Sequence, residues 1–285
     1  GARVKSIREE ADGVLVTAGD QVFQSRWLIG ADGVNSITAQ ALGLLPNRKT
    51  GIALEAELAV PAAVLEQMGQ SVIFDFGALP DGYGWVFSKQ DHLSVGLFQA
   101  KAGKNGSLQK QLQHFIACQP LLNEYEVMHI QGHRIPLGGG ERAELHTRRC
   151  LLAGDAANLA DPWLGEGVYY AARSGRLAAE TLLAAHQQAS TGHEVGLWGY
   201  TSRVQAEIRR DFHYAAALAR LVYRLPRLAT HLLKHTPSAR EILFRKIRGD
   251  YTFRETCFRL LLNSPWFLLQ ALRSILFRLP VKPEI

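Results

Sequence analysis

The sequence predicts a mixed α/β fold, and three features of its 285 residues indicate it. Two apolar, strand-like runs, at 27–33 and at 150–155, each end where an Asp and a Gly are adjacent. Each such strand end is called a corner below. Much of the segment between them alternates apolar and polar residues, as antiparallel strands do. The segment after the second corner reads as helices broken by prolines. Strand–corner–helix units around an inserted block of strands are typical of an α/β frame that carries a separate antiparallel layer.

Residues 1–50 form the first predicted part, which opens on a β-hairpin. Apolar and polar residues alternate on both sides of Asp12-Gly13, and Asp-Gly between two alternating runs is a strong hairpin signal. The predicted elements are, in order, strands at 2–8, 13–18 and 21–30 and a short helix at 35–43.

Residues 51–137 form a second predicted part, an antiparallel β domain that would face the substrate. Four strand-length runs with period-2 character occur in it, at 51–60, 71–78, 82–89 and 92–100. A single helix is predicted late in this part, over about 107–118, because Leu108, Leu112, Phe115 and Ile116 recur at helical spacing.

Residues 138–195 return to the strand–corner–helix pattern. The run at 150–153 is short and fully apolar, as expected of a strand that is buried on both faces. Residues 162–188 are predicted to form one helix, with Pro162 in its first turn, where proline is well tolerated.

Residues 196–285 form a basic, helical C-terminal region. Residues 201–285 contain 16 Lys and Arg against 6 Asp and Glu, whereas residues 1–200 contain 16 against 20. This asymmetry favours an anionic partner for the C-terminal region, either a membrane surface or a nucleic acid. Arginines interleave with apolar groups over 258–280, a pattern that suits a helix lying in a membrane interface or one that covers the core.

Several classes of protein are disfavoured by composition. The sequence contains no apolar run of about 18 residues that would span a bilayer, and no secretory signal at its start. Three scattered cysteines favour a reducing compartment over a disulfide framework. His231 and His235 stand at a zinc-compatible spacing but lack a third ligand, so a solvated helix face and no metal site are expected. No nucleic-acid-binding module is visible. We expect a cytoplasmic protein, with peripheral contact at the inner face of the membrane.

The corner at 150–167 has the residue types of a ligand site. Gly154 lets a ligand approach the backbone at the end of a strand, and the carboxylate of Asp155 can accept hydrogen bonds from the hydroxyls of a sugar-like chain. Gly165 and Gly167 would leave the first amides of the following helix bare, which favours an anion or an electron-rich ring edge. Asp32-Gly33 follows a strand in the same way, so the two corners are predicted to share one nucleotide-type ligand.

These motifs resemble those of a known family. "GADGVNS" at 30–36 is similar to the Asp-Gly motif of flavin-dependent hydroxylase-type enzymes, and "GDAANLADPWLGEGVYYAARSG" at 154–175 to their Gly-Asp motif. The wording "GEGVYYAARSG" is most similar to the geranylgeranyl reductase branch of FAD-dependent oxidoreductases. "PDGYGWVFSK" at 80–89 resembles a strand of that branch, with Tyr83, Trp85 and Phe87 in place.

The resemblance implies a flavin-hydroxylase-like fold and assigns roles to individual residues. It implies that Asp155 holds the ribityl chain of FAD and that the helix start at 162–167 faces the edge of the isoalloxazine ring. The implied cofactor-binding residues are Asp32, Gly33, Gly154, Asp155, Pro162, Gly165, Glu166 and Gly167, and the implied substrate-binding residues are Tyr83, Trp85 and Phe87. No catalytic residue is assigned.

The sequence departs from the family pattern in three places. It lacks the Gly-x-Gly-x-x-Gly strand–turn–helix that holds the pyrophosphate, so we expect a fold without its first βαβ unit and weak binding of FAD by this chain alone. Ser88 replaces a proline of the strand motif, and an arginine usual after the first Asp-Gly is absent.

The expected function is the saturation of carbon–carbon double bonds in a prenyl group of the geranylgeranyl type by hydride transfer from reduced FAD. The expected partner is an isoprenoid lipid, and the expected electron donor is NADPH or ferredoxin. A flavin-dependent monooxygenase on the same scaffold and a lipid-binding remnant without flavin remain as alternatives.

Overall fold

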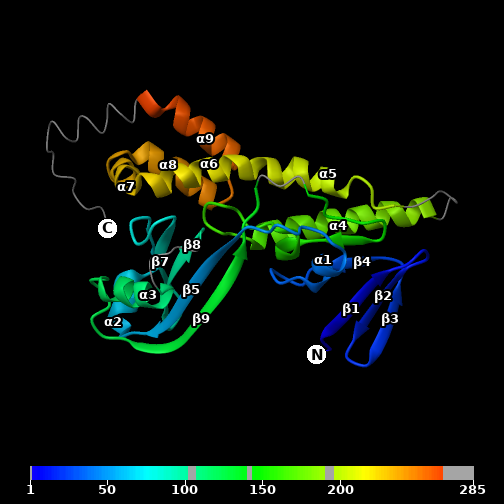
Figure 1. Ribbon diagram of the computed structural model, residues 1–285. Coiled ribbons are helices and arrows are strands. Elements are labelled where there is room, and N and C mark those ends of the chain that lie inside the picture. Colours follow the sequence, from blue (N-terminus) through cyan, green and yellow to red (C-terminus); the bar gives the residue numbers. More distant parts are fainter. Residues whose placement is uncertain (1, 102–106, 140–142, 190–195, 266–285) are drawn as a thin grey trace.

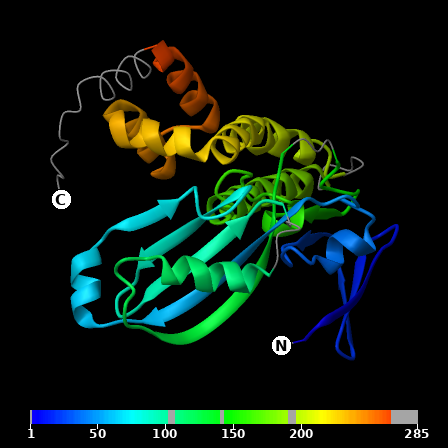
Figure 2. The ribbon, with the colours of Figure 1, turned by 60° about the vertical axis from the view of Figure 1, so that its left-hand side comes forward.

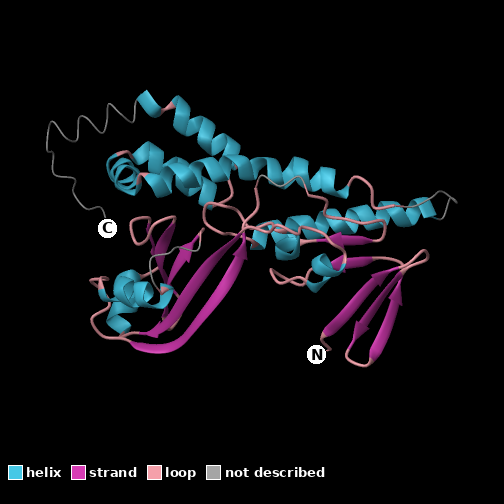
Figure 3. Cartoon of the chain, in the orientation of Figure 1, coloured by secondary structure: helices cyan, strands magenta, loops and turns pink. Residues whose placement is uncertain are grey.

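The computed structural model describes residues 2–101, 107–139, 143–189 and 196–265. It confirms a mixed α/β fold with an antiparallel sheet and C-terminal helices. A small sheet lies near the N-terminus, a larger sheet lies at the other end, and long helices run across both (Figures 1 and 3).

The small sheet contains the predicted hairpin. It has three antiparallel strands in the order β1 (Val4–Glu9), β2 (Val14–Ala18) and β3 (Gln21–Ser25). The prediction of one strand over 21–30 is wrong, because the chain breaks after Ser25 and β4 (Leu28–Gly30) pairs with a different sheet. The side-chain hydroxyl of Ser25 donates to the carbonyl of Trp27 at 2.9 Å and stabilises this break.

The large sheet is antiparallel throughout and has the strand order β6-β7-β8-β5-β9. Its strands are β5 (Thr50–Ala59), β6 (Val72–Asp75), β7 (Gly82–Ser88), β8 (Leu93–Gln99) and β9 (Glu126–Pro136). Helix α3 (Leu108–Ala117) is as predicted, whereas the short helix α2 (Ala62–Met68) was not predicted. Its N-cap is Pro61, which offers no side-chain capping bond, so the usual start signal is missing.

Each face of the large sheet is covered by helices. On one face, Phe115 of α3 packs closely on Gly84 of β7, where a Cβ would lie 2.5 Å from the ring. On the other face, Tyr83 and Phe98 pack with residues of the C-terminal helices, including Val222 and Tyr223. The result is a three-layer arrangement of helix, sheet and helices (Figure 2).

A two-stranded parallel sheet joins the two corners that the sequence singled out. Strand β4 pairs with β10 (Cys150–Leu152), and both strands lead into short helices, α1 (Ile37–Ala41) and η1 (Gly154–Ala157). Strand β10 is buried along its whole length, as predicted. Helix α4 (Val168–Ala189) packs over this unit through Tyr170, Leu177 and Ala178.

The C-terminal region is helical over its described residues. Its elements are α5 (Tyr200–Val204), the π-helical turn η2 (Gln205–Arg209), α6 (Arg210–Arg224), α7 (Pro226–His235), α8 (Pro237–Ile247) and α9 (Phe253–Leu262). Pro226 and Pro237 start α7 and α8, which confirms the predicted breaks. Most of the segment 258–280, predicted to lie in a membrane interface or to cover the core, lies outside the described residues. Across the part of the chain that is described, no helix is long and apolar enough to cross a bilayer.

Candidate functional site

The two acid–glycine corners lie side by side. Strands β4 and β10 are parallel and in register, with Gly30 opposite Leu152. The backbone N–H of Ala153 donates to the carbonyl of Gly30 at 2.9 Å, so the strands leave the sheet together. Asp32 and Asp155 therefore follow the carboxyl ends of neighbouring parallel strands, which is where α/β sheets bind ligands.

The carboxylate of Asp32 is engaged within its own loop. It accepts hydrogen bonds from the hydroxyl of Ser36 at 2.5 Å, and from the backbone N–H and hydroxyl of Thr38 at 2.9 and 3.1 Å. Partial burial opposes ionisation of Asp32, but these hydrogen bonds outweigh it and lower the pKa below the ordinary value. Gly33 takes a positive φ of 78° in the turn that makes this loop. The side chain of Asp32 thus holds the start of α1, and its role toward a cofactor stays a prediction.

The carboxylate of Asp155 has different surroundings. It is half-buried, and it accepts no hydrogen bond from any residue that the structure describes. Burial without a compensating partner raises its pKa. The carboxylate lies beside Gly167, where an added Cβ would sit 3.2 Å from Oδ1. Asp155 is therefore an acceptor that faces the turn before α4 and receives no hydrogen bond on its carboxylate from the described part of the chain.

Gly154 brings the strand end against helix α4. Its φ is 59°, and an added Cβ would lie 3.1 Å from the Cβ of Ala171. The backbone N–H of Gly154 donates to the hydroxyl of Ser174 at 2.9 Å. Glycine is needed here both for the left-handed conformation and for the close approach of the helix.

The predicted helix over 162–188 starts too early. Helix α4 begins at Val168, and Pro162 lies six positions before it, in a turn. The first turn ends at Gly165, whose φ of 73° is left-handed, and this turn is organised by Asp161, which sequence reasoning did not single out. Its carboxylate accepts the backbone N–H groups of three residues of the turn, at 2.8, 2.9 and 2.9 Å, namely Trp163, Leu164 and Glu166. The bonds to Trp163 and Leu164 are those of an N-cap and are compatible with a helix, whereas the left-handed Gly165 and the bond to Glu166 close the turn before a helix can continue.

Asp161 is the organising residue of this turn and is only 2% exposed. Burial raises its pKa to about 6, against the opposing effect of the three amides. An Asp whose side chain accepts amides two and three residues on is a known turn former, so Asp161-Pro162 was the available signal. The expectation that the glycines leave the first amides bare therefore holds only in part.

Two amides at the end of the turn do remain without an acceptor. Among the described residues, nothing accepts a hydrogen bond from the backbone N–H of Gly167 or Val168. The carboxylate of Glu166 accepts the next amide, that of Tyr169, at 2.8 Å. Gly165, with a φ of 73°, allows the turn to pass close to Phe98. Free amides at the start of a helix of 22 residues carry partial positive charge and favour an electron-rich group.

The predicted substrate residues lie on β7, next to this turn. Tyr83 is buried and its hydroxyl donates to the carbonyl of Leu164 at 2.7 Å. The indole N–H of Trp85 donates to the hydroxyl of Ser94 at 3.0 Å, and Phe87 stacks on Trp85 with ring centroids 6.0 Å apart. The strand is thereby joined to the turn at 161–167, but contact of these three residues with a substrate stays a prediction.

The turn is also joined to the C-terminal helices. The hydroxyl of Tyr223 on α6 donates to the carbonyl of Trp163, and Trp163 stacks on Phe76 with centroids 6.2 Å apart. Burial raises the pKa of both Tyr83 and Tyr223, so the two phenols stay protonated donors at neutral pH. The turn that faces Asp155 is consequently fixed from the sheet on one side and from α6 on the other.

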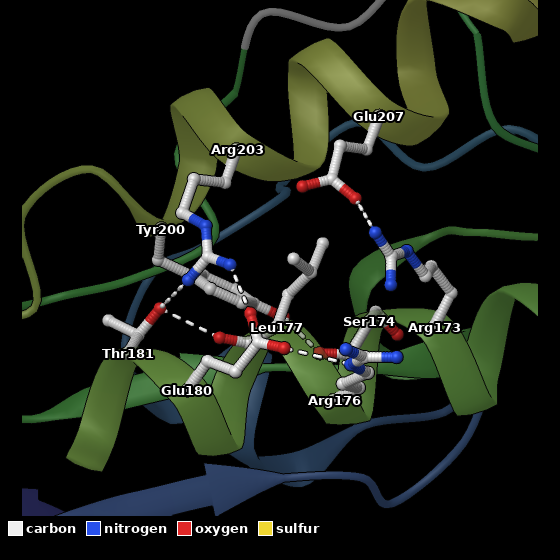
Figure 4. Close-up of polar contacts among 9 residues, drawn as sticks. All are labelled: Arg173, Ser174, Arg176, Leu177, Glu180, Thr181, Tyr200, Arg203 and Glu207. Carbon is white, nitrogen blue, oxygen red and sulfur yellow. Dashed lines mark hydrogen bonds and ion pairs between the residues drawn. The ribbon is translucent and has the colours of Figure 1, made fainter. Parts of the chain in front are cut away.

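Ion pairs fix α4 against the helix that follows it. Arg173 pairs with Glu207, and Arg203 with Glu180, across the two helices, while Arg176 pairs with Glu180 along α4 (Figure 4). The hydroxyl of Tyr200 donates to the carbonyl of Leu152 at 2.7 Å, at the end of β10. These contacts hold α4 in place relative to β10, the strand that precedes Asp155.

The histidine pair differs from the expectation of a solvated face. His231 and His235 are both half-buried, and their rings lie 4.5 Å apart. Over the described ranges, no group of three or more His, Cys, Asp and Glu side chains is arranged to hold a metal ion.

The parallel strand pair, the half-buried acid and the amides before α4 are the residue types expected of a site for a nucleotide-type cofactor. Comparison with known families agrees: the model of the FAD binding domain family matches residues 1–206, and the chain belongs to this family.

The similar curated proteins include a geranylgeranyl diphosphate reductase and a digeranylgeranylglycerophospholipid reductase. An uncharacterized protein of Methanosarcina barkeri is 30% identical over 261 residues, which are 90% of this chain and 63% of that protein. Geranylgeranyl diphosphate reductase of a Synechocystis strain is 34% identical over 162 residues, 55% of this chain and 38% of that protein. Digeranylgeranylglycerophospholipid reductase of Methanothrix thermoacetophila is 25% identical over 261 residues, 86% of this chain and 61% of that protein. The chain is thus distantly homologous to geranylgeranyl reductases, and it spans less than two thirds of the length of these relatives.

Solved structures agree on the fold. A geranylgeranyl bacteriochlorophyll reductase-like protein from Thermoplasma acidophilum superposes with a TM-score of 0.67 at 19% identity, covering 78% of this chain and 58% of that chain. A halogenase solved in complex with FAD superposes with a TM-score of 0.55 at 16% identity, covering 91% of this chain and 58% of that chain.

Proposed function

We propose that this chain acts in an FAD-dependent reductase that saturates carbon–carbon double bonds of a prenyl group of the geranylgeranyl type. The observation that carries the proposal is the half-buried carboxylate of Asp155, which has no partner among the described residues and faces the glycine turn before α4. Homology to reductases of geranylgeranyl groups supports the choice of substrate class.

The residues present fit a flavin. A half-buried carboxylate without a donor is costly unless a ligand supplies hydroxyl groups, and a ribityl chain does so. The unpaired amides of Gly167 and Val168 suit the ring edge that gains negative charge on reduction. In this proposal Asp155 accepts from the ribityl hydroxyls, and the turn of Pro162, Gly165, Glu166 and Gly167 contacts the ring. Asp32 and Gly33 shape the neighbouring corner.

FAD, when bound and reduced, supplies a hydride to one carbon of the double bond, and a proton completes the other carbon. The chain's own residues position and enclose this chemistry. Asp161 holds the turn rigid, and the phenols of Tyr83 and Tyr223 hold it against the sheet and α6. Tyr83, Trp85 and Phe87 offer an apolar aromatic surface to the isoprenoid chain, which excludes water from the reacting centre.

The test is a mass measurement on the product. The purified protein, in as long a form as its gene encodes, is supplied with FAD, chemically reduced with dithionite, and incubated without oxygen with geranylgeranyl diphosphate or a digeranylgeranyl lipid. The expected product is heavier by two hydrogen atoms for each bond reduced. Dithionite bypasses the natural donor; NADPH and ferredoxin are then offered in its place to identify it.

Two results would refute the proposal. A product heavier by one oxygen atom, formed only in air, would indicate a monooxygenase on the same scaffold. A protein that binds the lipid but takes up no flavin would indicate a lipid-binding remnant.

A further inference from the structure

The corner between α6 and α7 exposes three leucines. Leu221, Leu225 and Leu228 are 58%, 47% and 48% exposed. They lie four and three positions apart across the junction of the two helices, where the backbone N–H of Leu225 donates to the carbonyl of Leu221 at 3.1 Å and that of Ala229 to the carbonyl of Leu225 at 2.9 Å. Apolar side chains of this size gathered at one exposed corner mark an interaction surface.

The same corner is strongly basic. Arg220, Arg224 and Arg227 alternate with the leucines, and no acid occurs between Asp211 and Glu241. Those two acids are themselves engaged. Asp211 accepts the amides of Phe253 and Arg254, both at 2.8 Å, and Glu241 pairs with Arg245.

The arginines of the corner have no ion-pair partner in the described structure. Arg224 and Arg227 are exposed, and neither forms an ion pair with any residue in the described ranges. An anionic phospholipid bilayer has charged phosphates at its surface and apolar acyl chains beneath them. Leucines that alternate with arginines without an ion pair in the described structure complement such a surface. A nucleic acid also carries negative charge, but it has no apolar layer in which the leucines could be buried.

The opposite side of the same helix reaches the candidate site. Val222 and Tyr223, next to Leu221 in sequence, are buried, and the hydroxyl of Tyr223 donates to the carbonyl of Trp163 in the turn at 161–167. The C-terminal end of α6 therefore has leucines and arginines on its exposed side. Its buried side contacts the turn at 161–167 through Tyr223. A lipid-soluble substrate would reach the site over a short path from such a membrane contact.

We propose that the α6–α7 corner docks on the surface of an anionic phospholipid bilayer, with Leu221, Leu225 and Leu228 in the apolar boundary and Arg224 and Arg227 at the lipid phosphates. The contact is interfacial: no described helix can span a bilayer. It does not depend on the reductase activity, although it suits an enzyme whose substrate is a lipid.

The test uses sedimentation with vesicles that contain no prenyl lipid, so that substrate binding plays no part. One set is phosphatidylcholine alone, and the other contains phosphatidylglycerol as well. The protein should bind the anionic vesicles more tightly, and added salt should weaken that binding. Replacing Leu225 and Leu228 by Glu should weaken it by roughly a hundredfold, about tenfold for each leucine removed from the apolar boundary.

Matched variants separate docking from folding. Replacing Arg224 and Arg227 by Gln should weaken binding to anionic vesicles by roughly fivefold for each arginine and leave binding to phosphatidylcholine unchanged. Leu183→Glu, at an exposed leucine of α4, and Arg8→Gln, on β1, should change neither. Circular dichroism melts identify any variant that fails to fold.

Three outcomes would overturn the proposal. The first is absence of binding to anionic vesicles. The second is equal binding by folded corner variants and the unchanged protein. The third is a dimer in gel filtration that the leucine variants break while vesicle binding stays the same, which would assign the corner to a second copy of the chain.

Discussion

Asp32 and Asp155 follow two neighbouring parallel strands, yet their carboxylates meet different surroundings. Ser36 and Thr38 follow Asp32 and donate three hydrogen bonds to it, whereas the alanines after Asp155 have no side-chain donor to offer. The pKa of Asp32 is consequently lowered and that of Asp155 is raised. An acid at the end of a strand therefore stabilises its own loop when hydrogen-bond donors follow it closely in sequence. Where alanines follow it instead, its carboxylate stays available to a ligand.

Asp161 extends the comparison to a third acid, which is engaged like Asp32 but buried. Replacing it with Ala leaves three amides of the turn without their acceptor, so the free energy of unfolding should fall by about 3 kcal/mol. Urea unfolding measures this, with Asp20→Ala, at a fully exposed acid, as the control. An unchanged midpoint would show that the turn does not depend on Asp161.

The Asp155 corner should matter for the ligand and little for the fold. Asp155→Ala is expected to weaken FAD binding by roughly a hundredfold, because it removes charged hydrogen bonds to the ribityl hydroxyls. Its free energy of unfolding without FAD should stay the same or rise slightly, since a half-buried, unpartnered charge is lost. Fluorescence titration with FAD measures the affinity, and urea unfolding measures the free energy of unfolding. A variant that binds FAD normally would break the assignment.

The Asp32 corner should behave in the opposite way. Asp32→Ala removes the hydrogen bonds that hold the start of α1, so the free energy of unfolding should fall by about 1–2 kcal/mol. FAD binding should weaken less than in Asp155→Ala, because the effect reaches the cofactor only through the loop. If Asp32→Ala weakened FAD binding more than Asp155→Ala, Asp32 and not Asp155 would be the main contact of the cofactor.

The smallest expected effect is in the pH dependence of stability, where the two acids have opposite signs. The pKa of Asp32 is lowered on folding, so its contribution to stability is present above the ordinary Asp pKa and is lost as the pH falls through the lowered value. The pKa of Asp155 is raised, so its charge costs stability as the pH rises through the raised value.

Asp32→Asn and Asp155→Asn test these signs in thermal melts near neutral pH and near pH ~3, below the ordinary Asp pKa. Asp32→Asn should destabilise at neutral pH and Asp155→Asn should stabilise slightly, and both differences should shrink at the low pH. Effects of the same sign would mean that the two carboxylates have similar surroundings.

Sequence reasoning predicted the two corners, the hairpin, the block of antiparallel strands and the C-terminal helices, because each depends on local periodicity and on glycine and proline. It failed where a side chain redirects the backbone. The left-handed Gly165 and the bond from Glu166 to Asp161 close a turn between Pro162 and the start of α4, and the run from Gln21 to Gly30 breaks at Arg26 although its pattern is continuous.

The different hydrogen-bonding surroundings of Asp32 and Asp155 could not be predicted from the sequence pattern either. Both follow an apolar strand, and only the folded loop brings Ser36 and Thr38 onto the carboxylate of Asp32. The links from Tyr83 and Tyr223 to the turn join residues 81 and 60 positions apart, which no local signal predicts.

The most direct test is an experimental structure of the protein with FAD bound. The expected result is a carboxylate oxygen of Asp155 within hydrogen-bond distance of a ribityl hydroxyl, the amides of Gly167 and Val168 at the edge of the ring, and Asp32 still bonded to Ser36 and Thr38. A cofactor held by Asp32, with Asp155 remote from it, would contradict the account.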